Sequence, residues 1–113
     1  MSSSQWFRDE AKWSPAEKKL AREAFERAYQ RKCAALLAEV KGMIARDSSP
    51  SVIWKLHDFL SRERKTVDKK FDYRYSVLLD VFGTLLREGW LKEEDLAGLA
   101  ENKIERIKHW ASL

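Results

Sequence analysis

Apolar residues recur at spacings of three and four through the first half of the chain, which is the period of an amphipathic α-helix. This stripe consists of Leu20, Ala24, Phe25, Ala28, Tyr29, Cys33, Leu36, Leu37, Val40, Met43 and Ile44. The stretch Ser14-Pro15-Ala16-Glu17 lies before it and predicts a helix start, because serine caps the first turn, proline suits the first helical position and glutamate can complete a capping box. The pattern therefore predicts one long helix that ends at a turn over residues 46–50.

The length of this helix bears on assembly. About thirty residues at ~1.5 Å each form a rod of ~45 Å, whereas a compact domain of this size has a radius of gyration of only ~13 Å. The rod should therefore extend past its own core and leave part of its apolar stripe uncovered. A second copy of the chain is the simplest cover, so we predict a homodimer with Leu36 and Leu37 at the interface.

A second helix is predicted to restart at Ser49-Pro50 and to run to about Lys65 or a little beyond, before the pattern is interrupted at residues 68–72. At ~100° per residue, one face of this helix is apolar and carries Ile53, Leu56, Leu60 and Val67. Trp54 lies on the opposite side, among charged residues such as Asp58. A large aromatic side chain in that position either packs on a second surface of the same protein or binds a partner.

Three shorter helices are predicted after the second one. A third helix is expected from about Asp72 to Gly89, because glycine commonly follows a helix end. A short helix is expected from Leu91 to Leu99, with three acidic residues in its first turn, where the helix dipole favours them. The inner face of a final short helix is formed by Ile104, Ile107 and Trp110.

These elements predict an all-α fold in which a long antiparallel helical stalk, at about residues 14–66, carries a small helical head, at about residues 71–111. Residues 13–113 are expected to form this single helical domain, and residues 1–12 a flexible N-terminal tail. The composition agrees, because 44% hydrophobic and 35% charged residues are typical of a folded soluble domain. Only 4 Gly and 2 Pro occur, which favours long helices over a β fold with many turns.

Candidate catalytic chemistry is sparse. Cys33 is a lone cysteine, so neither an intrachain disulfide nor a Cys/His metal site is supported, and we expect a buried thiol. The chain has no phosphate-binding glycine loop, no HExxH and no CxxC motif, so we expect no metal and no cofactor. His57 and Asp58 are adjacent, and helical neighbours point ~100° apart, which is a poor geometry for an acid–base pair. We therefore expect no catalytic residues and no enzymatic activity.

Charge and hydropathy indicate which classes of partner the chain is expected to bind. The net charge is +4, and much of it comes from residues 62–70, where basic residues accompany Glu63 and Asp68. Such a strip at a helix end is commonly solvated, and no helix-turn-helix pattern with a recognition helix is present, so we do not expect nucleic-acid binding. No stretch approaches the ~20 apolar residues that span a bilayer, and the N-terminus lacks the pattern of a signal peptide. We therefore expect a cytoplasmic location without membrane insertion.

A protein-binding role remains for the side of the second helix that carries Trp54. This side combines an aromatic anchor with the imidazole of His57, the carboxylate of Asp58 and the guanidinium of Arg64. Trp and Arg are enriched among the residues that dominate interface energies. The alternative is that Trp54 packs on the partner chain of the dimer while Asp58 pairs with a local arginine. The residue pattern leaves both interpretations open.

Two runs in the second half of the chain are distinctive. They are Trp54-Lys55-Leu56-His57-Asp58-Phe59-Leu60-Ser61, followed by Arg64, and Asp68-Lys69-Lys70-Phe71-Asp72-Tyr73-Arg74-Tyr75-Ser76-Val77. Further agreement lies at Trp13-Ser14 and Ala28-Tyr29-Gln30-Arg31. From about residue 13 to its end, the chain therefore resembles the cyanobacterial fluorescence recovery protein family.

The resemblance implies an all-helical dimer without a chromophore that binds the light-activated orange carotenoid protein, through that protein's C-terminal domain. Binding would speed the relaxation from the red to the orange form and promote detachment from the phycobilisome, which ends photoprotective quenching. By the same resemblance, Trp54, His57, Asp58 and Arg64 are partner-binding residues. Leu37 matches a position of the family's dimer interface, beside Leu36 and with Trp54 as a further interface candidate. A cyanobacterial location would be cytoplasmic, near thylakoid-attached phycobilisomes.

The chain departs from the family pattern at Asp80, where the family's head presents a large apolar residue, and in its serine-rich N-terminus. These departures keep an alternative function open. In that alternative, the chain is a fluorescence-recovery-like helical dimeric adaptor that binds a different protein partner in an organism without phycobilisomes.

Overall fold

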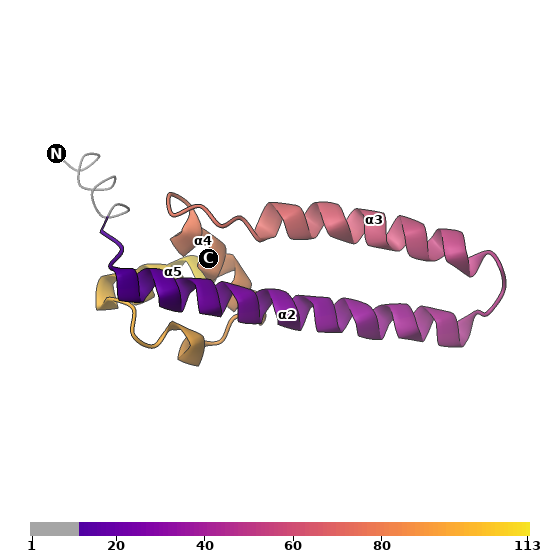
Figure 1. The fold of residues 1–113 in the computed structure, drawn as a ribbon, viewed down its shortest axis with the longest axis horizontal. Helices are drawn as coiled ribbons and strands as arrows, with labels where there is room; N and C mark the ends of the chain where they lie inside the picture. Colours follow the sequence, from indigo (N-terminus) through magenta and orange to yellow (C-terminus); the bar gives the residue numbers. More distant parts are fainter. Residues whose placement is uncertain (1–11) are drawn as a thin grey trace.

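The computed structural model describes residues 12–113. Its regular elements are α2 (Pro15–Arg46), α3 (Val52–Lys70), α4 (Leu78–Arg87), the 3₁₀ helix η1 (Glu93–Leu96) and α5 (Glu101–Ala111) (Figure 1). The described part of the chain contains no strand, so the all-α prediction is confirmed there. The predicted N-terminal tail, apart from Lys12, lies outside the described residues.

The start of α2 is the one that the sequence predicts. The N–H of Glu17 donates to Oγ of Ser14 at 3.1 Å, and the N–H of Ser14 donates to Oε1 of Glu17 at 3.2 Å. Pro15 occupies the first helical position. This capping box satisfies backbone donors that would otherwise lack partners, and it therefore determines where the helix begins.

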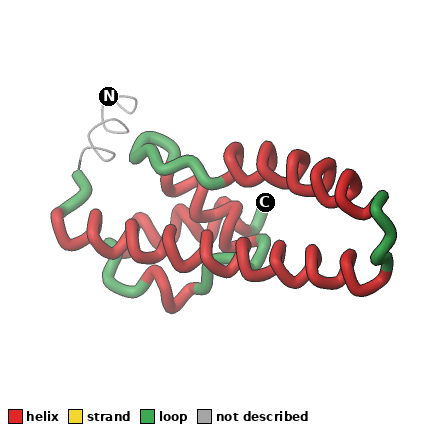
Figure 2. Tube along the Cα trace, turned by 45° about the vertical axis from the view of Figure 1, so that its right-hand side comes forward, coloured by secondary structure: helices red, strands yellow, loops and turns green. Residues whose placement is uncertain are grey.

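α2 and α3 form an antiparallel hairpin whose outer half extends beyond the other helices (Figures 1 and 2). α2 has 32 residues, which at ~1.5 Å per residue correspond to ~48 Å. The chain measures 60 × 26 × 26 Å and has a radius of gyration of 17.4 Å, against ~13 Å for a compact domain of this length. The overhang that the helix length predicts is therefore present.

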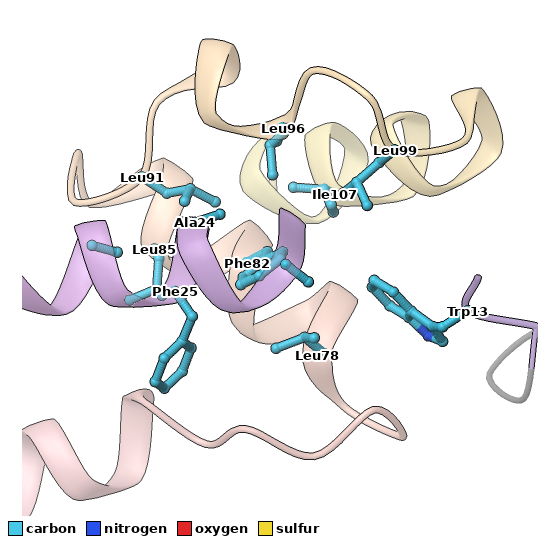
Figure 3. Packing of buried hydrophobic residues seen from close by; sticks show 12 residues of the cluster. Trp13, Ala24, Phe25, Leu78, Phe82, Leu85, Leu91, Leu96, Leu99 and Ile107 are labelled. Atoms are coloured by element: carbon cyan, nitrogen blue, oxygen red, sulfur yellow. The ribbon is translucent and has the colours of Figure 1, made fainter. Parts of the chain in front are cut away.

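The hydrophobic core lies where α4, η1 and α5 pack on the N-terminal half of α2 (Figure 3). Its fully buried large side chains are Leu78, Phe82, Leu85, Leu91, Leu96 and Ile107. α2 contributes Ala21, Ala24 and Ala28, which are fully buried, and such small side chains allow other elements to approach its backbone closely. α4 and α5 also approach closely at Gly83, where an added Cβ would lie 2.5 Å from Cδ1 of Trp110.

A buried carboxylate joins η1 to α2. Oδ2 of Asp95 accepts hydrogen bonds from Nη1 of Arg31 at 2.7 Å and from the N–H of Lys92 at 2.9 Å. Burial acts to raise the pKa of Asp95, but these hydrogen bonds and the charges of Arg31 and Arg27 outweigh it and hold the pKa below its ordinary value. The ionised form of Asp95 is therefore the one that fastens η1 to α2.

A second carboxylate joins α5 to the start of α2. Glu17 accepts hydrogen bonds from Nζ of Lys103 at 2.9 Å and from the N–H of Ala100 at 2.9 Å. Burial acts to raise the pKa of Glu17, but the donors Ala100, Lys103 and Ser14 lower it below its ordinary value. Glu17 thus completes the helix cap and also anchors the start of α5. Its hydrogen bond with Ala100 joins residues that are 83 positions apart.

The bounds of α3 differ from the prediction at both ends. The helix begins at Val52 rather than at Ser49-Pro50, and it continues through Lys70 rather than ending a little beyond Lys65. At the first end, residues 49–51 form a turn, in which the N–H of Val52 donates to the carbonyl of Ser49 at 3.0 Å. At the other end, no residue before Lys70 breaks the helical hydrogen bonding.

An irregular segment, residues 71–77, replaces the first turns of the predicted third helix. The rings of Phe71 and Tyr73 lie edge-on to Phe25 of α2, with centroid distances of 5.6 and 4.9 Å. These tertiary contacts hold the start of the segment outside any helix, and residues 75–77 form a turn. α4 therefore begins at Leu78 rather than near Asp72.

The later elements agree with the prediction at two points and differ at one. Gly89 follows the end of α4 with φ +85°, as expected of a glycine after a helix. α5 forms where a final helix is predicted. The short helix predicted from Leu91 to Leu99 is instead the four-residue 3₁₀ helix η1, because the Asp95 carboxylate bonds the N–H of Lys92 and closes a single tight turn.

Candidate protein-interaction surface

The predicted partner-binding residues lie along the side of α3 that α2 does not cover. We call this surface the Trp54 face and define it by Trp54, His57, Asp58 and Arg64. Trp54 is 69% exposed, and the other three residues are exposed as well. Within the single chain, the prediction that Trp54 points away from the core is confirmed. A large ring in solvent among charged groups is typical of a contact surface.

His57 lies between the ring of Trp54 and the carboxylate of Asp58. The Trp54 and His57 ring centroids are 6.4 Å apart with an interplanar angle of 72°, and Nδ1 of His57 is 3.4 Å from Oδ1 of Asp58. The two side chains therefore touch at their ends although they are helical neighbours. The contact is long and solvated, so it orients the imidazole weakly and does not form a buried acid–base pair.

Arg64 is held in place by Asp68, one helical turn further on. Nε of Arg64 donates to both carboxylate oxygens of Asp68 at 3.2 Å. The pair lies near Tyr29 of α2, whose pKa is raised chiefly by a hydrogen bond with Cys33, while Arg64 lowers it and Asp68 raises it. Cys33, expected to be buried, is half-buried. At Arg64 the Trp54 face therefore continues toward α2.

α3 turns a different apolar side toward α2 than the one predicted. Val52 and Val67 are buried and Leu56 is half-buried, whereas Ile53 and Leu60 are 59% and 43% exposed. The predicted shared face is therefore wrong for Ile53 and Leu60. Because successive helical residues are ~100° apart, the burial of Val52 at the first helical position turns Ile53 toward solvent.

The hairpin also exposes large apolar side chains that are not part of the Trp54 face. This exposed apolar set consists of Tyr29, Leu37 and Ile44 of α2 and Ile53 and Leu60 of α3. Of the predicted dimer residues, Leu37 is 59% exposed, Trp54 is exposed and Leu36 is half-buried. Sequence reasoning missed Ile53 and Leu60 as surface residues, since the helical pattern alone assigns them to the buried side.

Other kinds of site find no support in the described residues. No group of His, Cys, Asp and Glu side chains there could hold a metal ion. No helix in residues 12–113 is long and apolar enough to cross a membrane. Asp80, the position that departs from the resemblance, lies 3.4 Å from Nη2 of Arg106 and so forms an ion pair between α4 and α5.

Known proteins are similar in sequence to this chain over most of its length. A family model described as "Photoprotection regulator fluorescence recovery protein" matches residues 13–111. The fluorescence recovery protein of Synechocystis sp. PCC 6803 is 44% identical over 104 residues, which are 92% of this chain and 95% of that protein.

Solved structures share the fold. The structure of the Synechocystis fluorescence recovery protein matches with a TM-score of 0.81 at 44% identity, and that of the Fremyella diplosiphon protein with 0.80 at 40% identity. Each match covers 89% of this chain and 99% of the solved chain. The chain therefore belongs to the fluorescence recovery protein family, whose members regulate photoprotection and are not enzymes.

Proposed function

We propose that the chain binds the photoactivated orange carotenoid protein, speeds its relaxation from the red to the orange form and promotes its detachment from the phycobilisome. The observation that carries this proposal is the 69% exposure of Trp54, beside His57 and Asp58, in a chain of a photoprotection-regulator family. The Trp54 face is the contact surface that we assign, and its target is the C-terminal domain of the carotenoid protein.

The composition of the Trp54 face suits a protein partner. Covering roughly 130 Å² of the Trp54 ring at ~25 cal/mol per Å² would contribute about 3 kcal/mol to binding. Asp58 and Arg64 carry opposite charges, so they favour one orientation of a complementary surface and disfavour others. Trp54 thus provides affinity, while the charged groups select the partner.

A rigid helical scaffold can accelerate a relaxation without chemistry of its own. It must bind the transition state, or a compact intermediate, better than it binds the open red form. Holding the separated domains of the carotenoid protein together raises their effective concentration, which favours their reassociation. The long hairpin of α2 and α3 offers an extended surface for this purpose.

We propose further that the chain acts as a homodimer with Leu36, Leu37 and Trp54 at or near the interface. The exposed apolar set supports this, because one hairpin leaves five large apolar side chains in solvent that a second copy could cover. A dimer with two-fold symmetry would present the same surface twice. We place this dimer in the cytoplasm, near thylakoid-attached phycobilisomes.

Dark recovery of purified orange carotenoid protein tests the proposal. The carotenoid protein is converted to its red form with blue-green light, and its return is followed by absorbance with and without an equimolar amount of the chain. We expect a faster return in the presence of the chain. An unchanged rate would contradict the proposal and favour an adaptor that binds a different protein.

A further inference from the structure

The chain repeatedly places a cation over an aromatic ring with a carboxylate beside it. In one case, Nζ of Lys103 lies 4.8 Å from the ring centroid of Trp13 and 2.9 Å from Oε1 of Glu17. The same arrangement occurs for Lys32 over Trp90 beside Glu63 and for Arg22 over Tyr73 beside Glu26. Ring quadrupole and carboxylate both attract the cation, so each arrangement joins segments that are distant in sequence.

A hollow near the end of α3 has the rings and the carboxylates of this arrangement. We call it the aromatic notch; its volume is about 250 Å³, and it is lined by Phe25, Glu26, Tyr29, Val67, Asp68 and Phe71. The Phe71 ring stands edge-on to Phe25 and to Tyr29, at centroid distances of 5.6 and 5.5 Å. Figure 3 shows the Phe25 ring on the side of α2 away from Leu96. The notch therefore opens at the edge of the core, of which Phe25 is a member.

Among the described residues, no lysine or arginine lies over the rings of Phe25, Tyr29 or Phe71. The two carboxylates at the notch are exposed at the surface. Both carboxylate oxygens of Asp68 accept from Nε of Arg64 at 3.2 Å, and Oε1 of Glu26 lies 3.9 Å from Nη1 of Arg22. The notch thus has rings and carboxylates like those of the other arrangements, but its carboxylates are paired at its edge with Arg64 and Arg22 rather than with a cation over its rings.

We propose that the aromatic notch binds a basic side chain, arginine or lysine, of the protein that occupies the Trp54 face. This inference rests on the proposed function for its partner and extends the contact surface toward the C-terminal helices. The two surfaces are continuous, because Asp68 of the notch is the hydrogen-bond partner of Arg64. A hollow of about 250 Å³ accommodates one long side chain, whose cation would meet the rings and pair with Glu26 or Asp68.

A small-molecule titration tests the notch without the protein partner. N-acetyl-L-arginine N-methylamide is added to the intact chain while aromatic NMR signals are recorded, and the norleucine analogue serves as the uncharged comparison. We expect the signals of Tyr29 and Phe71 to shift with the arginine compound, and the shifts to be lost in the double variant Glu26→Gln/Asp68→Asn. The matched control Glu23→Gln/Glu39→Gln, also on exposed positions, should respond like the original chain. Equal shifts with both compounds, or in both double variants, would overturn the inference.

Binding to the photoactivated carotenoid protein provides the second test. Losing two partly exposed charge contacts should weaken this binding by about tenfold in Glu26→Gln/Asp68→Asn, with an unchanged dimer and an unaffected control variant. Part of the loss should already appear in Glu26→Gln, which leaves the Asp68–Arg64 pair of the Trp54 face intact. If the double variant binds equally well, the notch has no such role. If the double variant alters only the dimer, the second copy fills the notch and the inference is wrong. If the original chain fails to bind at all, the proposed function is at fault, and the arginine titration alone decides on the notch.

Discussion

Asp95 is a single residue on which several contacts converge. It accepts hydrogen bonds from Arg31 and from the N–H of Lys92, and Arg31 also donates to the carbonyl of Trp90 at 2.9 Å. We predict that Asp95→Asn lowers the free energy of unfolding by about 2 kcal/mol, since a half-buried arginine loses its charged partner. Urea denaturation measures this loss. The neighbouring exposed Glu94→Gln should stay within about 0.5 kcal/mol of the original chain, and equal effects of the two substitutions would contradict the account.

Two glycines within helices should respond to alanine in opposite directions. At Gly83, an added Cβ would lie 2.5 Å from Trp110, so we predict that Gly83→Ala destabilises the chain by about 1–3 kcal/mol through overpacking. At Gly42 the nearest atom is the movable end of Arg46 at 3.1 Å, so Gly42→Ala should be neutral or stabilising by up to about 1 kcal/mol. Thermal unfolding of both variants checks the pair. A stable Gly83→Ala variant would show that α4 and α5 are not packed as described.

Single residues were predictable from the sequence where their partners are local. The capping box of Ser14 and Glu17 spans three positions, and its consequence for the helix start is independent of the fold. The second role of Glu17, as an acceptor for Lys103, joins positions 86 apart. Nothing in the local pattern indicates such a partner, because it arises only when the C-terminal helix returns to the start of α2.

At the scale of elements, Glu17 and Asp95 connect α2 to α5 and η1, and both carboxyls have pKa values below the ordinary values of 4.5 and 3.8. A pKa lowered by folding stabilises the folded chain above the ordinary pKa, and this stabilisation is lost as the pH falls through the lowered value. We therefore predict a loss of stability below about pH 4.5.

Urea denaturation at pH 7 and at pH 3 measures this dependence. Glu17→Gln/Asp95→Asn should be less stable at pH 7 and should lose less stability on acidification than the original chain. Asp47→Asn is the comparison: the pKa of Asp47 is also lowered, to about 2, chiefly by hydrogen bonds from Ser49, but Asp47 lies in the exposed turn between α2 and α3. Solvent screens that site, so we expect this variant to change the pH dependence less than the double variant does. If the double variant kept the full pH dependence, other carboxyls would be responsible.

Some helices could be predicted from the sequence more accurately than others. α2 was predicted well because a strong cap and an uninterrupted apolar period act together over 32 residues. The segment at residues 71–77 was missed, since its tyrosines and Phe71 pack on α2 rather than on a helix of their own. The orientation of α3 was predicted only in part. α3 has more apolar residues than one neighbouring helix can cover. The sequence pattern therefore does not determine which of them are left in solvent.

At the scale of the whole molecule, the hairpin extends past the core and leaves apolar side chains exposed, which is why we propose a dimer. We predict that Leu37→Glu, which places a charge within the exposed apolar set, shifts the chain toward a monomer at micromolar concentration. Size-exclusion chromatography with light scattering measures the mass. Leu113→Glu is the matched control, because Leu113 is similarly exposed, at 69% against 59%, but belongs to neither α2 nor α3. A chain that is monomeric before any substitution would contradict the dimer.

The central claim is that the Trp54 face engages the orange carotenoid protein and is not merely a packing surface of the dimer. Asp58 separates these roles, because its carboxylate is exposed on that face, and leucine there would remove the charge without filling the core. A control substitution, Glu94→Leu, makes the same change at an exposed position outside the face.

The most direct measurement is the rate of the red-to-orange return with the Asp58→Leu variant, at a concentration where its mass by light scattering is that of a dimer. We predict that this variant no longer accelerates the return, while Glu94→Leu accelerates it like the original chain. Full acceleration by a dimeric Asp58→Leu variant would contradict the claim, and so would a variant that unfolds or becomes monomeric, because Asp58 would then serve the dimer rather than the partner.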